Sequence, residues 1–227
     1  MLLKIALTAT IVLSLLQLHA QVKAVTEYGD TIYVYDNGTW TYELEYDAPD
    51  LPSATDNVTN ADAPIDTVDV NYTYPSSSSK SANNRAGMYR LHYNPEHWKR
   101  VPPASFNEDA EFVLQHRQND AFALVIWEET PIDPEVLYRI ALENMATVGE
   151  VDDVTVKKVE HLKVNGSPVI RATYTAKIQT IPVTFVAQYY SDDRGCMQFL
   201  VWTSDTIWKS RTEQLNNLAA GLAVIKE

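Results

Sequence analysis

The alternation of apolar and polar positions over residues 154–203 predicts four consecutive β-strands. The dipeptide Asn165-Gly166 separates the first two, and it is typical of a type I′ hairpin turn because both of its positions adopt positive φ. The strand expected over residues 168–179 alternates strictly, which indicates burial on one face only. Residues 196–202 are apolar at nearly every position, so we expect an interior strand covered on both faces.

Two amphipathic helices are predicted beside these strands. Asp133 is a good N-cap and Pro134 suits the first helical position, so the first helix is expected over residues 133–149. Its apolar positions recur at helical spacing and comprise Val136, Leu137, Ile140, Ala141, Met145 and Val148. The last helix begins near Ser204 or Asp205. Its buried side is expected to comprise Trp208, Leu215, Leu218, Ala219, Leu222 and Ile225.

The first twenty residues have the pattern of a secretory signal peptide. Lys4 precedes an apolar run over residues 5–16, which is too short for a stable membrane span, and Ala20 supplies a small residue for cleavage. Gln21 would follow the cut, where a bacterial lipoprotein would carry cysteine. We therefore expect a protein that is exported to the periplasm or beyond without a lipid anchor or a membrane span.

The charge balance excludes some classes of partner. The formal net charge is −12, and removal of the leader with Lys4 makes it one unit more negative. Nucleic acids and anionic membranes are bound through basic patches, so neither is an expected partner. Cys196 is the only cysteine, so the fold must rest on core burial rather than on an internal disulfide.

Residues 21–46 carry the signal of a separate β-hairpin that turns at Asp36-Asn37-Gly38. Its aromatic residues are Tyr33, Tyr35, Trp40 and Tyr42. An isolated hairpin is marginally stable in water, so it is expected to dock on the main domain or on a symmetry mate. Alternatively, the aromatic residues form an interaction surface for a protein or glycan partner, or the hairpin mediates self-assembly.

Residues 47–87 are rich in proline, serine, asparagine and aspartate, and Ser76–Ser81 has low complexity. Such a composition predicts a disordered acidic linker, because it buries too little apolar surface to offset the entropy of ordering. Within it, only residues 68–74 have the composition of a strand. The folded domain is then expected over residues 88–227, with a short first strand at 89–93 and a hairpin over 111–127.

The segment Tyr93-Asn-Pro-Glu-His-Trp98 ends the first expected strand, and a hairpin, a crossover helix, the meander of residues 154–203 and a final helix follow it. This order resembles the PsbP-like family, which includes a Ran-binding nuclear import factor. The resemblance covers residues 88–227. It implies an α+β fold, namely an α/β/α sandwich around a central antiparallel sheet. It also implies binding or assembly rather than catalysis, with no catalytic set to transfer.

The sequence shows no established catalytic, cofactor or metal motif. Cys196 lies within an apolar strand, where a thiol is normally inert. His92 and His97 lack the spacing of a metal site. Glu128 and Glu129 follow a buried strand, which leaves open an envelope hydrolase with a loop-built site near these residues and His97. We expect an exported, non-catalytic binding or assembly module, with this hydrolase as the alternative.

Overall fold

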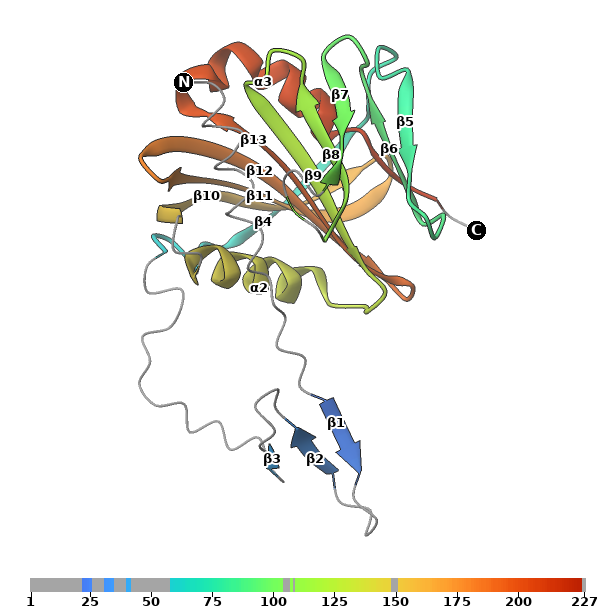
Figure 1. Ribbon diagram of the computed structural model, residues 1–227, viewed down its shortest axis with the longest axis vertical. Coiled ribbons are helices and arrows are strands. Elements are labelled where there is room, and N and C mark those ends of the chain that lie inside the picture. The colour runs from blue at the N-terminus through green and yellow to red at the C-terminus, as the bar shows by residue number, and fades with distance from the viewer. Residues whose placement is uncertain are drawn as a thin grey trace.

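The computed structural model in Figure 1 describes residues 22–25, 31–34, 40–41, 58–103, 107, 109–147 and 151–225. The predicted leader of residues 1–20 and the turn at Asp36–Gly38 lie outside these residues. No helix in the described ranges has both the length and the apolar character needed to cross a bilayer.

An eight-stranded sheet forms the centre of the fold. In spatial order its strands are β4 (Ile65–Tyr72), β10 (Val151–Val164), β11 (Ser167–Ile178), β12 (Ile181–Asp192), β13 (Gly195–Ser204), β9 (Ala121–Glu128), β8 (Ala110–His116) and β7 (Trp98–Val101). Neighbours pair antiparallel except β4 and β10, which are parallel. The four predicted meander strands are β10 to β13, and β13 is interior as predicted. Asn165 and Gly166 both have positive φ, as a type I′ turn requires.

Helices cover both faces of this sheet (Figure 1). On one face α2 (Pro134–Thr147) contributes Leu137, Tyr138 and Leu142 to a core cluster. On the other face α3 (Asp205–Ala219) contributes Leu215 and Leu218 to a second cluster. The predicted α+β class and the α/β/α sandwich are therefore confirmed.

The beginning of α2 matches the prediction, but part of its buried face does not. Asp133 Oδ1 accepts hydrogen bonds from the backbone N–H groups of Glu135 (2.9 Å) and Val136 (3.3 Å), so Asp133 is the N-cap. Val136 was expected to be buried and is 49% exposed, whereas Tyr138 and Leu142 are buried. The helix is rotated so that the aromatic ring of Tyr138 enters the core.

The prediction that β11 is buried on one face only is wrong. Arg171 lies on its supposedly exposed face and is only 8% exposed. The guanidinium donates to Asn216 Oδ1 of α3 at 2.6 Å and lies over the ring of Tyr72, 4.9 Å from its centroid. The packing of α3 on this face therefore buries Arg171, which its charge had led us to place in solvent.

A second sheet comprises β14 (Leu222–Val224), β6 (Tyr89–Tyr93) and β5 (Lys80–Asn83) in that order. The first predicted strand of the domain is β6. Leu222 was assigned to the last helix, but that helix ends at Ala219 and Leu222 pairs with Leu91 in the sheet. Leu222 happens to continue the helical spacing of the apolar residues in α3, although it lies in β14.

The prediction of a disordered linker over residues 47–87 is wrong for residues 58–87. Thr59 forms a parallel bridge with Thr155, and β4 continues this pairing along the edge of the main sheet. Most side chains of β4 are exposed, with Ile65 and Val68 half-buried. β4 is held by backbone hydrogen bonds to β10, which do not depend on apolar side chains. Its polar composition therefore did not indicate an ordered strand.

Near the N-terminus the structure has β1 (Val22–Val25), β2 (Thr31–Val34) and β3 (Trp40–Thr41). Antiparallel pairing of Tyr33 with Thr41 confirms that the predicted hairpin strands are neighbours. The sequence did not predict β1, which pairs antiparallel with β2.

Candidate functional site

The hairpin of β8 and β9 carries polar groups at both of its ends. Ala110 pairs with Ile126 at one end, and Gln115 pairs with Phe122 near the turn at the other. Ala110 and His116 are six residue steps apart, which at about 3.3 Å per step places the two ends roughly 20 Å apart. The two ends therefore form separate environments.

At the first end there is a solvent-open cleft of about 750 Å³. It is lined by the β5–β6 turn, by the start of β8 and by the end of β9. The lining residues are Asn84, Arg85, Ala86, Pro103, Asp109, Ala110, Glu111, Trp127 and Glu129. A volume of this size suits a small molecule or a few residues of a peptide. We call it the Trp127 cleft.

Glu111 fixes one wall of the Trp127 cleft. Its Oε2 accepts from Asn84 Nδ2 at 2.8 Å and from the Tyr89 hydroxyl, while its Oε1 accepts from the backbone N–H of Arg85 at 2.7 Å. Burial and the adjacent carboxylate of Glu111 raise the pKa of Tyr89, so its hydroxyl stays a donor. The carboxylate of Glu111 therefore holds the β5–β6 turn against β8 and is already occupied.

Trp127 is held in place from two sides. Its ring centroid lies 6.1 Å from that of Tyr89, and a Cβ atom at Gly195 would lie 2.6 Å from Trp127 Cζ2 and Cη2. A side chain at Gly195 would thus displace the indole. Because only glycine fits there, the cleft has a rigid aromatic wall.

Three carboxylates lie at this end of the hairpin, and none of them has a cationic partner among the described residues. Asp109 and Glu129 are exposed and Glu128 is half-buried. Burial, and secondarily the charge of Asp109, raises the pKa of Glu128. No lysine, arginine or histidine in the described part of the chain forms an ion pair with any of the three.

Cys196 pairs with Glu128 across β13 and β9 and is buried. Burial first, and then the nearby charge of Glu128, raises the pKa of the thiol to about 11. The thiol is therefore protonated at neutral pH, and a protonated buried thiol is a poor nucleophile. This agrees with the inert role expected for Cys196.

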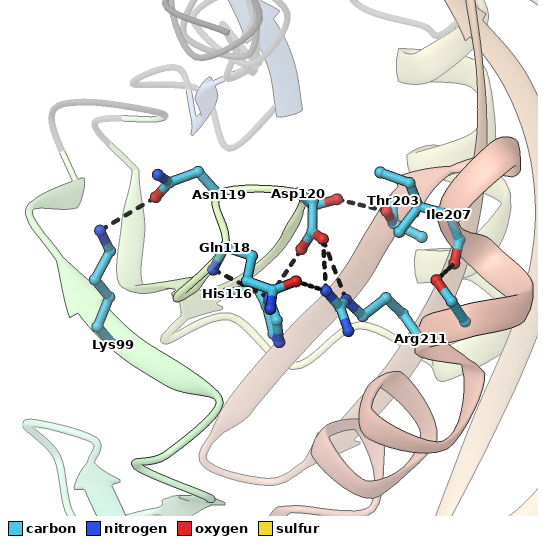
Figure 2. Close-up of polar contacts among 9 residues, drawn as sticks. Lys99, His116, Gln118, Asn119, Asp120, Thr203, Ile207 and Arg211 are labelled. Atoms are coloured by element: carbon cyan, nitrogen blue, oxygen red, sulfur yellow. Dashed lines mark hydrogen bonds and ion pairs between the residues drawn. The ribbon is translucent and has the colours of Figure 1, made fainter.

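At the other end of the hairpin a carboxylate has two partners, as Figure 2 shows. His116 is 3% exposed, and its Nδ1 lies 2.8 Å from Asp120 Oδ1. From α3, Arg211 donates to Asp120 Oδ2 through Nη2 (2.9 Å) and Nε (3.2 Å), and it also donates to Gln118 Oε1. Thr203 Oγ1 donates to the Asp120 carbonyl oxygen at 2.5 Å. We call these residues the His116 network.

The His116 network joins the β8–β9 turn to α3. The Asp120 carboxylate only accepts hydrogen bonds, so we place the proton of the neutral imidazole on Nδ1. The backbone N–H of Gln118 also lies 3.3 Å from this nitrogen, and it donates to Nδ1 in the other tautomer, in which the proton is on Nε2. Burial lowers the pKa of His116, and the charge of Arg211 adds to this effect against the opposing charge of Asp120.

Nε2 of His116 is buried and has no hydrogen-bond partner within the described ranges. A histidine–aspartate pair catalyses acyl transfer only when this nitrogen contacts a nucleophile. The nearest rings are those of Trp98 and His97, with centroids at 5.3 and 6.2 Å. The described network therefore stabilises the packing of α3 and lacks the third member of a triad.

The residues suggested for a hydrolase site do not converge. Glu129 lines the Trp127 cleft, with Glu128 beside it, whereas the backbone of His97 pairs with Arg117 at the far end of β8. His92 is also separate and stacks on Tyr74 at 4.0 Å. In the ranges that the structure covers, no three His, Cys, Asp or Glu residues are arranged to hold a metal ion.

The predicted aromatic interaction surface remains a prediction. Tyr33 and Trp40 lie in β2 and β3, while Tyr35 and Tyr42 fall outside the described residues. The sequence singled out Glu128 and Glu129 but gave no sign of Arg85 and Asp109, which also lie at this end of the hairpin. These two residues come from separate turns, so no local pattern marks them as neighbours.

The described architecture is an α/β/α sandwich around the eight-stranded sheet. Comparison with models of protein families and with curated proteins finds no match for this sequence. Among solved structures, the chain is similar to cyanobacterial PsbP (CyanoP) from Synechocystis. The TM-score is 0.51 at 16% sequence identity, over 64% of this chain and 92% of that one. The chain thus has the PsbP-like fold that its sequence predicted.

Two further structures are more distantly similar. LpqN, involved in cell envelope biogenesis of Mycobacterium tuberculosis, has a TM-score of 0.47 at 11% identity, over 65% of this chain and 90% of that one. The Ran-binding protein Mog1p of Saccharomyces cerevisiae has a TM-score of 0.44 at 9% identity, over 65% and 95%.

Proposed function

We propose that the protein is an exported, non-catalytic binding module and that the Trp127 cleft is its ligand site. One observation carries this proposal: the cleft combines a fixed aromatic wall with carboxylates that have no cationic partner in the described structure. Ligand sites are commonly concave, with aromatic side chains and a few polar or charged groups that fix the orientation of the ligand. The proposed export rests on the signal-peptide pattern of residues 1–20.

A binding role fits the separation of the titratable groups. A hydrolase site that used His97 together with Glu128 or Glu129 would need these groups within hydrogen-bonding reach of one substrate. His97 lies about 20 Å from Glu128 and Glu129 along β8, by the strand repeat of roughly 3.3 Å per residue. The thiol of Cys196 is protonated and buried.

An envelope hydrolase is the second candidate, because the pKa of Glu128 is raised. A carboxyl group with a raised pKa is better suited than an ordinary one to act as a general acid beside the carboxylates of Asp109 and Glu129. The test is turnover in a panel of ester, peptide and glycoside substrates by the purified protein. Turnover that the Glu128→Gln variant loses would favour the hydrolase and overturn the binding module.

The cleft's role is tested by affinity capture of partners from the envelope of the source cells. Ala86 is exposed and lines the cleft, so Ala86→Trp fills the cleft without changing any charge. Thr67→Trp, on the exposed edge strand β4, is the matched control. A partner retained by the wild type and by Thr67→Trp but lost by Ala86→Trp supports the proposal. Equal capture by all three proteins would exclude the cleft as the ligand site.

The aromatic residues Tyr33, Tyr35, Trp40 and Tyr42 are a second proposed contact surface, for a protein or a glycan or for self-assembly. Light scattering with and without residues 21–50 tests self-assembly. If the number of chains per particle is the same with and without residues 21–50, self-assembly through the hairpin is excluded.

A further inference from the structure

We infer that the Trp127 cleft binds a positively charged side chain, of arginine or lysine, carried by an extended segment of a partner protein. This inference rests on the proposed function and names its ligand. It follows from the charge, the aromatic wall and the size of the cleft.

The charges of the cleft come from two sources. Asp109 directly precedes β8 and Glu129 directly follows β9, and both are exposed and line the cleft, whereas Glu128, the last residue of β9, is half-buried and is not a lining residue. Asp109 and Glu128 already repel each other, because the charge of Asp109 contributes to the raised pKa of Glu128. A cation would relieve this repulsion, whereas an anion would increase it. Arg85 is the one basic residue among the lining residues, and it comes from the β5–β6 turn.

The aromatic wall favours an organic cation. An ammonium or guanidinium group within about 6 Å of an indole is attracted by the ring's quadrupole. Contacts with Tyr89 and the lack of space at Gly195 fix the indole of Trp127, so little side-chain entropy is lost when a ligand binds. Guanidinium groups also pair with carboxylates in a bidentate manner.

The size of the cleft indicates that the cation belongs to a larger molecule. A volume of about 750 Å³ exceeds what one guanidinium or ammonium group fills. A metal ion is a poor fit, since no three ligating residues converge in the described part of the chain. The backbone and neighbouring side chains of a peptide segment would occupy the remaining space.

The test is isothermal titration calorimetry of the purified full chain with the capped pentapeptide acetyl-Gly-Arg-Gly-Arg-Gly-amide. A peptide with citrulline in place of arginine keeps the shape and removes the charge, and spermidine serves as a free polycation. We expect the arginine peptide to bind about tenfold or more tightly than the citrulline peptide and than spermidine. A tenfold difference corresponds to about 1.4 kcal/mol.

Two double variants separate a site from general attraction to an acidic protein. Asp109→Asn with Glu129→Gln removes two charges from the cleft, and Asp66→Asn with Asp69→Asn removes two exposed charges from β4. The first is expected to weaken binding of the arginine peptide about tenfold, and the second by less than about twofold.

Equal losses in both double variants, or equal affinity for the arginine and citrulline peptides, would overturn the inference. Spermidine binding as tight as that of the peptide would overturn the assignment to a protein segment. If the peptide fails while capture of a partner still depends on Ala86→Trp, only the ligand class is wrong. If capture is also insensitive to Ala86→Trp, the proposed function fails with it.

Discussion

The two ends of the β8–β9 hairpin place carboxylates in opposite situations. Asp120 lies in the His116 network, with the imidazole of His116 on one oxygen and the guanidinium of Arg211 on the other. At the other end, Asp109 and Glu129 face the Trp127 cleft and have no cationic partner in the described residues. The same hairpin thus carries one neutralised carboxylate and one group of carboxylates that remain available.

This difference separates a polar cluster that stabilises the fold from the cleft that we propose as a ligand site. A charge with partners inside the chain contributes to folding, and its removal leaves those partners unsatisfied. A charge without partners adds little to folding and repels its neighbours, so its removal costs little. Removal of a carboxylate charge should therefore lower the free energy of unfolding much more in the His116 network than in the Trp127 cleft.

The largest effect is expected from Gly195→Ala, which acts on the rigid wall of the Trp127 cleft. Its Cβ would overlap the Glu128 carbonyl oxygen and lie 2.6 Å from the Trp127 ring, and φ is +150°. We expect the free energy of unfolding in urea to fall by about 3 kcal/mol. Gly166→Ala is the control, since φ is +80° but no atom lies within 4 Å. It should cost about 1 kcal/mol, and equal losses would show that Gly195 does not position Trp127.

The second prediction compares one substitution at the two ends. Asp120→Asn removes the charge that pairs with Arg211 and His116, and we expect unfolding free energy to fall by about 2 kcal/mol. Asp109→Asn should change it by less than about 0.5 kcal/mol. Urea denaturation of both variants at neutral pH measures the difference. A larger loss in Asp109→Asn would reverse the assignment of the two regions.

The third prediction concerns pH, because the two ends titrate with opposite signs. The pKa of His116 is lowered from 6.5, so the unfolded chain binds more protons and stability falls as pH drops below 6.5. The pKa of Glu128 is raised from 4.5, so the folded chain binds more protons and stability falls as pH rises above 4.5.

Urea midpoints between about pH 5 and about pH 7.5 measure both contributions. Between about pH 5 and about pH 7.5, the stability of the His116→Gln variant should rise less than that of the wild type, because the contribution of His116 is lost. The stability of Glu128→Gln should rise more than that of the wild type, because the opposing contribution of Glu128 is lost. Parallel profiles for both variants would contradict the opposite signs.

The smallest effect is expected from Arg85→Gln. The backbone N–H of Arg85 holds the turn to Glu111, and this contact survives the substitution. Loss of a like charge should raise affinity for the arginine pentapeptide about threefold, or about 0.65 kcal/mol. Calorimetry measures the change, and a weaker complex would show that Arg85 contacts an anionic group of the ligand.

The periodicity of apolar residues predicted those helices and strands in which one face is buried and the other is exposed. The meander and α2 were found because apolar residues recur at the period of a strand or a helix, and Asp133 marks the start of α2. β4 was missed because pairing with β10 orders it while most of its side chains stay in water. Arg171 was misplaced because its burial depends on α3, 45 residues away at Asn216.

The candidate site was less accessible to sequence reasoning. Glu128 and Glu129 were singled out because they follow a buried strand, but their proposed companion His97 lies at the other end of the hairpin. Asp120 and His116 are close in sequence, whereas Arg211, which completes their network, is 91 residues from Asp120. Only the pairing of strands and the packing of α3 bring such groups together.

The most direct test of the central claim compares the two tryptophans that report on these regions. Trp127 lines the cleft, and Trp98 is buried with its ring against His116. Their indole N–H resonances, assigned in NMR spectra with Trp→Phe variants, are followed during titration with the arginine pentapeptide. The account predicts a saturable shift at Trp127 and none at Trp98. A shift at Trp98 without one at Trp127 would contradict it.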